Sequence, residues 1–292
     1  MAGIQLKDRN FVITGPTSGI GKSTVEALAS AGGSLWLLCR NTAAGEALAT
    51  ELKAKGAESV ELVHCDLASL ASVRKAAEAV LESCPEIHVL ICNAGMGGYP
   101  GSGPRMTEDG LELVMQSNYF AHFLLTRLLL PKLREGSRIV NVSSTMHKFV
   151  KSLPMENLNF QAGERYSYNG HMPYSYSKLA QILSTNELHC RLREKGVLVN
   201  AIHPGFVATA IFNREPNMIG AIFAALSKWF KKPSEGAATV LWAAVSAECE
   251  GVSGAYLVDC APAATSLLAD NTLLAQQLWA ESCRLLHLPL HL

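Results

Sequence analysis

The sequence predicts an α/β fold in which one doubly wound parallel sheet of about seven strands is covered by helices on both faces. Short apolar runs alternate with longer segments of helical periodicity along the chain. These runs are apolar almost throughout, as in strands that are buried on both faces. No repeat, low-complexity segment or shift in composition divides the 292 residues, so we expect a single domain over residues 1–292.

The predicted elements follow one another as strand and helix. Strands are expected near 10–14, 34–39, 59–65, 87–92, 137–142, 197–202 and 254–258. Helical patterns cover 20–31, 43–55, 70–83, 108–133, 174–194 and 234–246, and a last one covers about 271–286. A helix between two strands is the usual connection in a parallel sheet.

Two segments break this alternation and are expected to be substrate-loop insertions. Residues 148–173 are polar and aromatic without a clear period, and 213–233 contain the apolar stretch Met218–Leu226 followed by Trp229–Lys232. Both follow strands at the edge where open α/β sheets bind ligands. Long loops at that edge are more often functional than not.

The composition argues against several classes of protein. The chain has 25 basic and 25 acidic residues and a formal net charge of zero, so no nucleic-acid partner is expected. Its eight cysteines form no Cys-x-x-Cys pair, which favours buried free thiols over disulfides or a metal site. Hydrophobic residues make up 49% of the chain, enough for a large core.

No membrane-spanning segment is expected from the sequence. Lys7, Asp8 and Arg9 interrupt the first apolar stretch before it resembles a signal peptide. No run reaches the roughly 18 apolar residues of a span, and the nearest, Phe120–Leu130, is broken by Arg127. We expect a cytoplasmic protein or one attached peripherally to an intracellular membrane.

A glycine-rich turn lies between the first strand and the first helix. Gly15, Gly19 and Gly21 have the spacing Gly-x-x-x-Gly-x-Gly. Glycines there permit a tight turn and a close approach of the backbone to a pyrophosphate, whose charge the helix N-terminus favours. The turn therefore indicates a dinucleotide site, and the alternative is a plain connection between a strand and a helix.

Tyr174 and Lys178 lie four residues apart in a predicted helix and so share one of its faces. A phenol normally loses its proton at about pH 10, which is too high for acid/base catalysis at neutral pH. A nearby cation lowers that pKa by favouring the phenolate. The pair indicates redox chemistry on an alcohol or carbonyl, although the same spacing also occurs on ordinary solvated helix faces.

Taken together, these motifs resemble the short-chain dehydrogenase/reductase family over roughly residues 8–260. The matching motifs, in the family's order, are Gly15/Gly19/Gly21, Asn93-Ala94-Gly95, Asn118, Ser144, Tyr174 and Lys178. The resemblance implies a Rossmann-type sheet and hydride exchange between a nicotinamide cofactor and an alcohol or carbonyl.

The resemblance also implies a role for each member of a catalytic set. Tyr174 would be the acid/base, and Lys178 would lower its pKa and bind the nicotinamide ribose. Ser144 would hydrogen-bond the substrate oxygen. Asn118 would hold a water that links Lys178 to solvent, and its alternative role is that of a half-buried hydrogen-bonding residue.

A cofactor site is implied by the same resemblance. Its expected residues are Gly15, Thr17, Ser18, Gly19, Ile20, Gly21, Arg40, Asn41, Asp66, Leu67, Asn93, Ala94, Gly95, Tyr174, Lys178, Pro204, Gly205, Val207 and Thr209. No acidic residue directly follows the second strand, whereas Arg40 does, so NADP(H) is expected over NAD(H). The alternative for Arg40 is a solvated side chain without a ligand. The resemblance implies that Asp66 contacts the adenine, and the alternative for Asp66 is a helix cap.

The substrate class is inferred from the branch that the chain resembles. Between Ser144 and Tyr174 lie 29 residues, and this expansion is similar to that of the retinol dehydrogenase-like branch. The branch implies a lipophilic alcohol, aldehyde or ketone such as a retinoid or steroid. Residues 213–233 would cover such a ligand, or else pack on the core, on a second subunit or on a membrane surface.

Three further expectations complete the sequence-based account. The alternative to an enzyme is a catalytically silent NADP(H)-binding scaffold, and a third hypothesis is a lipid-binding protein of the membrane surface. A homodimer is possible, because the helices at 108–133 and 174–194 form dimer interfaces in many relatives. His203 is expected to be structural, and His147 and His171 are loop residues within possible reach of substrate.

Overall fold

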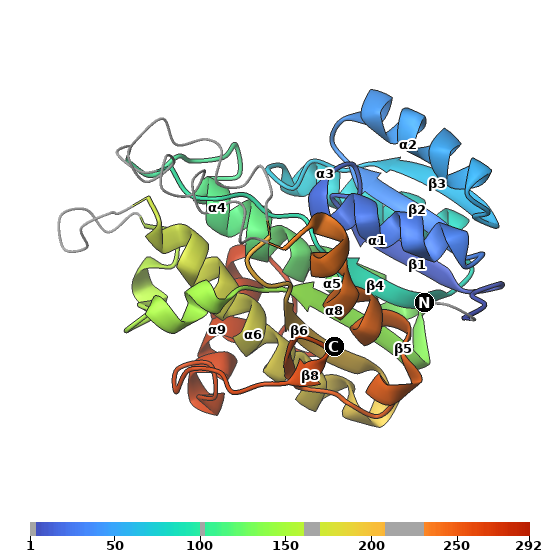
Figure 1. The fold of residues 1–292 in the computed structure, drawn as a ribbon. Coiled ribbons are helices and arrows are strands. Elements are labelled where there is room, and N and C mark those ends of the chain that lie inside the picture. Colours follow the sequence, from blue (N-terminus) through green and yellow to red (C-terminus); the bar gives the residue numbers. More distant parts are fainter. Residues whose placement is uncertain (1–3, 100–102, 161–169, 208–230) are drawn as a thin grey trace.

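The structure is a computed structural model that describes residues 4–99, 103–160, 170–207 and 231–292. Its strands are β1 Asn10–Thr14, β2 Ser34–Cys39, β3 Ser59–His64, β4 Ile87–Cys92, β5 Leu133–Val142, β6 Leu198–His203, β7 Tyr256–Val258 and β8 Ala261–Pro262. They form one sheet in the order β3-β2-β1-β4-β5-β6-β7-β8 (Figure 1). β1 to β7 pair in parallel and β8 adds a short antiparallel edge. The doubly wound sheet is confirmed, with one strand more than predicted.

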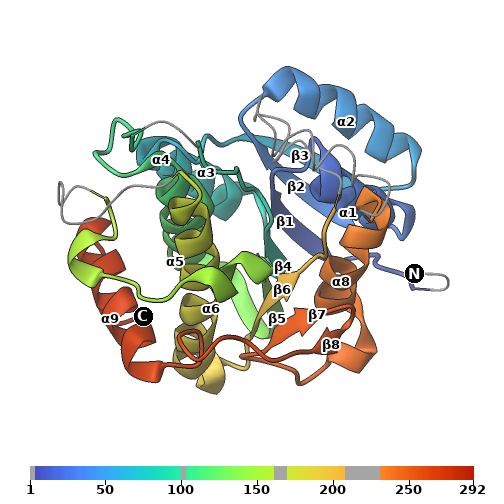
Figure 2. The same ribbon diagram turned by 60° about the vertical axis from the view of Figure 1, so that its left-hand side comes forward.

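The helices cover both faces of this sheet. They are α1 Gly19–Ser30, α2 Thr42–Ala54, α3 Leu70–Ser83, α4 Leu113–Met115, α5 Ala121–Leu129, α6 Met172–Leu192, α8 Pro233–Val245 and α9 Thr272–Leu285. In Figure 2, α1, α2 and α8 lie on one face of the sheet and α3, α5, α6 and α9 on the other. The apolar side chains of each group form the core on its own face. The central strands are buried on both sides, which explains their unbroken apolar sequences.

One predicted helix, over residues 108–133, is wrong at both ends. Glu112 caps α4 by accepting a hydrogen bond from a main-chain N–H at 2.8 Å, so the helical segment begins only at residue 113. Pro131 lies in a short 3₁₀ turn that leads directly into β5. Proline clashes with the preceding turn of an α-helix and cannot donate to it, so the chain leaves the helix there.

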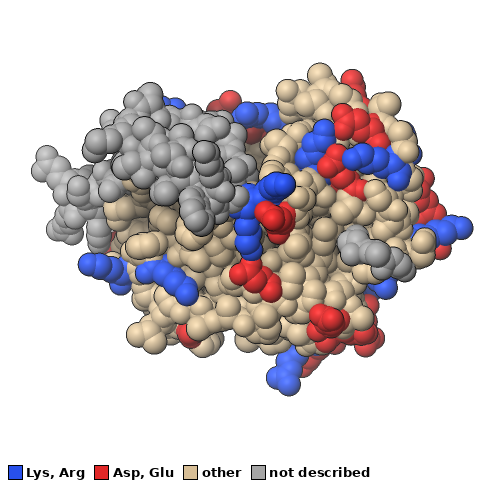
Figure 3. Space-filling model, viewed as in Figure 1, with Lys and Arg blue, Asp and Glu red and all other residues tan. Residues whose placement is uncertain are grey.

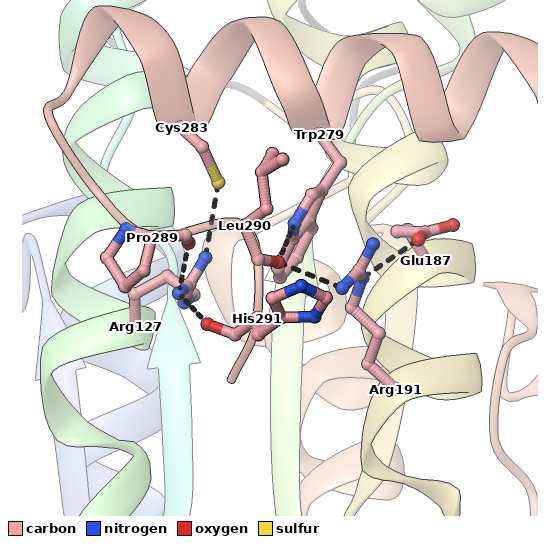
Figure 4. Close-up of polar contacts among 8 residues, drawn as sticks. All are labelled: Arg127, Glu187, Arg191, Trp279, Cys283, Pro289, Leu290 and His291. Carbon is pink, nitrogen blue, oxygen red and sulfur yellow. Dashed lines mark hydrogen bonds and ion pairs between the residues drawn. The ribbon is translucent and has the colours of Figure 1, made fainter.

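The C-terminal tail is fastened to two helices by arginines (Figure 4). The Trp279 ring of α9 lies between Arg127 of α5 and Arg191 of α6, whose guanidinium carbons are 4.9 and 4.3 Å from its centroid. Both arginines donate to main-chain carbonyls of residues 289–291 at 2.9 to 3.0 Å, and Arg191 also pairs with Glu187. The arrangement gives the buried Arg127 cation acceptors that replace water.

Charges are mixed over the visible surface of the molecule. On the face drawn in Figure 3, acidic and basic side chains of the described residues are interspersed. Within the described ranges, no helix combines the length and the apolar character needed to cross a bilayer.

Candidate active site

The glycine-rich turn is closed by backbone contacts that only glycine allows. Gly15 and Gly19 have positive φ angles of 66° and 54°. A Cβ on Gly21 would lie 2.1 Å from the carbonyl oxygen of Gly15, so a larger residue would displace α1 from the turn. Asn93 at the end of β4 donates from its side-chain amide to the carbonyls of Thr14 and Gly15, at 3.0 and 3.1 Å.

The first turn of α1 fits a phosphate group. Ser18 is the N-cap residue of α1 and is exposed. Its side chain makes no capping hydrogen bond to the helix, and the first turn contains no acidic residue. Thr17 and Ile20 are half-buried beside it. The N-terminal amides of this helix and its positive dipole end therefore suit the pyrophosphate of a dinucleotide.

The buried His122 connects Thr14, at the start of this turn, to the π-helical turn η1, Gln116–Phe120. Thr14 Oγ1 accepts the main-chain N–H groups of Asn93 and Ala94, each at 3.0 Å, and lies 2.8 Å from His122 Nε2. His122 Nδ1 donates to the carbonyl of Asn118 at 3.0 Å. Burial lowers the pKa of His122 to about 4, so the ring is neutral and its Nε2 accepts from Thr14.

The expected adenosine end of the site lies after β2 and β3. Arg40 is exposed. Asn41 caps α2 by accepting from a main-chain N–H at 3.0 Å. Asp66 accepts from the N–H two residues on at 3.0 Å, whereas Ser69 is the N-cap residue of α3. Asp66 thus closes the turn before the helix, and Leu67 beside it is half-buried.

The segment after β6 lines a cavity of about 670 Å³. Pro204, Gly205 and Val207 border it together with Ile20 from α1. Gly205 has a φ of +88°, a conformation that favours glycine. Thr209 lies outside the described residues, as do residues 161–169 of the first predicted insertion and 213–230 of the second.

Ser144 and Tyr174 both line this cavity, Ser144 from the end of β5 and Tyr174 from the first turn of α6. Burial raises the pKa of Tyr174 above its ordinary value, and a hydrogen bond from Ser144 opposes the rise, so the lowering of this pKa expected from Lys178 is not found. Lys178 follows one turn later, with its Nζ 5.5 Å from the centroid of the Tyr174 ring. The structure therefore brings together the three groups that the sequence singled out.

Lys178 is buried and held by polar acceptors. Its ammonium group donates to the carbonyl of Val142 at 2.7 Å and to Gln181 Oε1 at 3.2 Å. Burial lowers the pKa of Lys178 to about 7. A lysine with this pKa changes charge near neutrality, which is typical of functional sites.

Asn118 lies in the π-helical turn, a feature that is frequent at functional sites. Its side chain accepts from the main-chain N–H of Met96 at 2.8 Å and donates to Ser177 Oγ at 3.1 Å. Its main-chain carbonyl accepts from Gln181 Nε2 at 2.9 Å, and Gln181 in turn contacts Lys178. Asn118 and Lys178 are therefore linked through Gln181, and the expected water stays a prediction.

The sequence-based prediction did not include Gln181, Ser177 or His122. Gln181 lies three residues after Lys178 and His122 four residues after Asn118, spacings that place each pair on one helix face. These spacings could have indicated that Gln181 and His122 support the predicted site residues. Of the two loop histidines, His171 lines the cavity and His147 is buried with no exposed surface.

The rest of the cavity wall is largely apolar. Met146, Val150 and Met172 contribute to it, as do two phenylalanines. Phe149 is 72% exposed and Phe206 is 57% exposed, values that are unusual for large apolar side chains. The hydroxyls of Ser144 and Tyr174 thus face a space suited to an apolar molecule with one polar group.

Comparisons with solved structures support the fold. An uncharacterized protein from Mycobacterium paratuberculosis is 31% identical with a TM-score of 0.80, and covers 100% of this chain and 98% of its own. A blue fluorescent protein from a metagenomic library, in complex with NADPH, is 25% identical with a TM-score of 0.67, over 87% of this chain and 97% of its own.

Comparisons of sequence identify the family. A family profile described as short chain dehydrogenase matches residues 9–153 and 157–219. Human retinol dehydrogenase 11 is 39% identical over 98% of this chain and 88% of its own length, and human retinol dehydrogenase 12 is 38% identical over 97% and 88%. Chicken WW domain-containing oxidoreductase is 36% identical over 98% and 70%. This retinol dehydrogenase-like chain therefore belongs to the short-chain dehydrogenase/reductase family of NAD(P)-dependent oxidoreductases.

Proposed function

We propose that this enzyme interconverts a lipophilic alcohol and its aldehyde or ketone, with NADP(H) as its cofactor and Tyr174 as its acid/base. The observation that carries this proposal is the position of the Tyr174 and Ser144 hydroxyls in a largely apolar cavity beside the buried Lys178. When bound, NADP(H) supplies or accepts the hydride.

In the direction of reduction, Tyr174 donates its proton to the oxygen that becomes the alcohol. Ser144 hydrogen-bonds the same oxygen and holds it near the phenol. Burial keeps the Tyr174 pKa above its ordinary value, so the phenol carries its proton at neutral pH and suits the donor role. In oxidation, the positive charge of Lys178 stabilises the phenolate.

The preference for NADP(H) rests on the residue after β2. Arg40 is exposed there, and a guanidinium suits a ribose 2′-phosphate. Two solved relatives contain this form of the cofactor, the blue fluorescent protein with NADPH and Pseudomonas aeruginosa RhlG with NADP.

The substrate class rests on the cavity and on the named relatives. A volume of about 670 Å³ lies within the range that drug-sized ligands fill, and its wall holds few polar groups. The relatives that match nearly the whole chain are retinol dehydrogenases. We therefore place retinoids, steroids and other lipophilic carbonyls first among candidate substrates.

A substrate panel tests the proposal. Purified protein is mixed with NADPH and a retinal, a steroid ketone, a long-chain aldehyde or a quinone, and NADPH absorbance is followed. We expect turnover with at least one lipophilic carbonyl and much less with small polar ones such as glyceraldehyde. Tight NADPH binding without turnover on any member of the panel would instead support the silent scaffold.

A further inference from the structure

Unsatisfied polar atoms gather beside the proposed catalytic serine. Among the described residues, four buried side-chain atoms have no hydrogen-bond partner: Thr145 Oγ1, His147 Nε2, His203 Nδ1 and Tyr256 Oη. Two of them lie in η3, Thr145–Phe149, which follows Ser144, and the other two lie on β6 and β7. Buried polar atoms are nearly always hydrogen-bonded, so their concentration at one place points to a bound polar molecule.

His147 forms a hydrogen bond with the main-chain carbonyl of Ser144. Its imidazole has no exposed surface, and its Nδ1 lies 2.7 Å from the Ser144 carbonyl oxygen. Because a carbonyl only accepts, Nδ1 carries the proton. Burial lowers the His147 pKa, so the ring is neutral and Nε2 offers a bare lone pair.

Tyr256 supplies the complementary group. Its ring lies 5.0 Å from the His147 ring, centroid to centroid, at an interplanar angle of 74°. Its hydroxyl is buried and can donate, whereas His147 Nε2 can only accept. Tyr256 pairs with Ala201 on β6, so it shares a sheet face with His203, two residues further along that strand.

We propose that His147 Nε2 and Tyr256 Oη hold a water molecule between them, and that His147, fixed in this way, positions Ser144. The water accepts from the Tyr256 hydroxyl and donates to His147 Nε2, and His203 Nδ1 is its candidate third partner. A water that donates to Nε2 requires Nε2 to be unprotonated, so the ring proton is on Nδ1. This is the tautomer that donates to the Ser144 carbonyl. Ser144 is therefore held against β7 through a histidine that is not among the residues lining the cavity.

Tyr256→Phe separates this proposal from a hydroxyl that has no partner. If the hydroxyl binds the water, its loss lowers the melting temperature and cuts kcat by about three- to tenfold, while the KM for NADPH stays the same. If the hydroxyl is unpartnered, its loss leaves the melting temperature unchanged or raises it and leaves kcat unchanged, which overturns the proposal.

A double-mutant cycle tests whether the two residues act as one unit. His147→Asn keeps an amide donor for the Ser144 carbonyl but has no acceptor in the place of Nε2. We expect the double variant with Tyr256→Phe to lose no more kcat than the worse single variant. Multiplied losses would mean independent roles and would overturn the proposal. Tyr119→Phe is the control, since that hydroxyl pairs with Ser282 at 2.9 Å, and we expect lower stability with kcat unchanged.

The kinetic readout rests on the proposed function, so a second readout is independent of turnover. Nitrogen-15 NMR of the histidines should show His147 protonated on Nδ1, with an Nε2 resonance shifted by a hydrogen bond that disappears in Tyr256→Phe. A crystal structure should show a water between the two side chains. An Nε2 resonance that does not respond to Tyr256→Phe contradicts the proposal even if no substrate has been found.

Discussion

Lys178 combines a charge with burial, and this combination explains much of the site. Only 3% of the residue is exposed, and its ammonium group is held by a carbonyl and an amide oxygen rather than by a carboxylate. Burial lowers its pKa from 10.5 to about 7 because no anion compensates for the lost water. The protein therefore carries a group whose charge is destabilising in the fold.

Lys178→Met should show this cost as a dependence of stability on pH. The unfolded chain binds a proton on this lysine up to about pH 10, whereas the folded chain releases it near pH 7, so wild-type stability rises with pH between these values. The variant lacks this rise. We expect its stability relative to wild type to fall by about 2 kcal/mol from pH 7 to pH 9. A relative stability that does not change over this range would contradict the prediction, and chemical denaturation at each pH measures it.

Arg40→Asp should reverse the cofactor preference. The substitution removes the group proposed for a 2′-phosphate and adds one that suits a free 2′-hydroxyl. We expect kcat/KM for NADPH to fall at least about tenfold and that for NADH to rise. Lys53→Asp, at an exposed position in the last turn of α2, is the control for a change of charge. A wild-type preference for NADH, measured first, would contradict the assignment.

At the scale of elements, apolar runs predicted strands well and contacts between distant residues escaped prediction. The predicted helix 174–194 corresponds to α6, Met172–Leu192, whereas 108–133 contains a loop, a π-helical turn and the start of β5. An apolar pattern continues through these changes because all the pieces face one core. The bounds of the helical segment were decided by the side chain of Glu112, which caps its start, and by the ring of Pro131 after its end.

The tail is an element whose role depends on partners far away in sequence. Arg127 meets carbonyls more than 150 residues later, a contact that no local pattern indicates. Deleting residues 287–292 removes the carbonyl acceptors of this buried cation and leaves it only the thiol of Cys283. We expect the free energy of unfolding to fall by about 2–3 kcal/mol. The control, Arg284→Ala, breaks an exposed pair with Glu281 and should cost less than about 1 kcal/mol. Equal melting temperatures for the truncated and full chains would contradict this role.

At the scale of the whole molecule, the sheet order follows from parallel pairing and brings the predicted strand ends to one edge. Gly15, Asn93, Ser144 and Pro204 come from the ends of β1, β4, β5 and β6, which are successive neighbours in the sheet. The site was therefore predictable from the positions of these residues. Its inner support through His122, Gln181 and His147 was not, because it depends on how helices rotate against the sheet.

The chain's own C-terminal helix α9 packs against the two helical segments that were expected to form a homodimer interface. Tyr119 Oη lies 2.9 Å from Ser282 Oγ, and the rings of Phe123 and Trp279 meet edge to face at 4.9 Å. A dimer through the surfaces of α5 and α6 that α9 contacts would require α9 to leave. The homodimer itself stays a prediction.

Cofactor binding should stabilise the whole molecule. A ligand that binds only the folded chain adds about 2.7 kcal/mol at a concentration one hundred times its Kd. We expect NADPH to raise the melting temperature and NADH, at the same concentration, to raise it less. An equal shift with both cofactors would argue against a 2′-phosphate site at Arg40. This readout needs no substrate.

The most direct test of the central claim is the turnover of Tyr174→Phe with the best lipophilic carbonyl and NADPH. Removing the proton donor should lower kcat by at least about a hundredfold, while the NADPH-induced rise in melting temperature persists. Tyr176→Phe, two residues along the same helix, should keep kcat within about threefold, because that tyrosine has Ala180 instead of lysine one turn later. Near-normal turnover of Tyr174→Phe, with cofactor binding intact, would contradict the proposed chemistry.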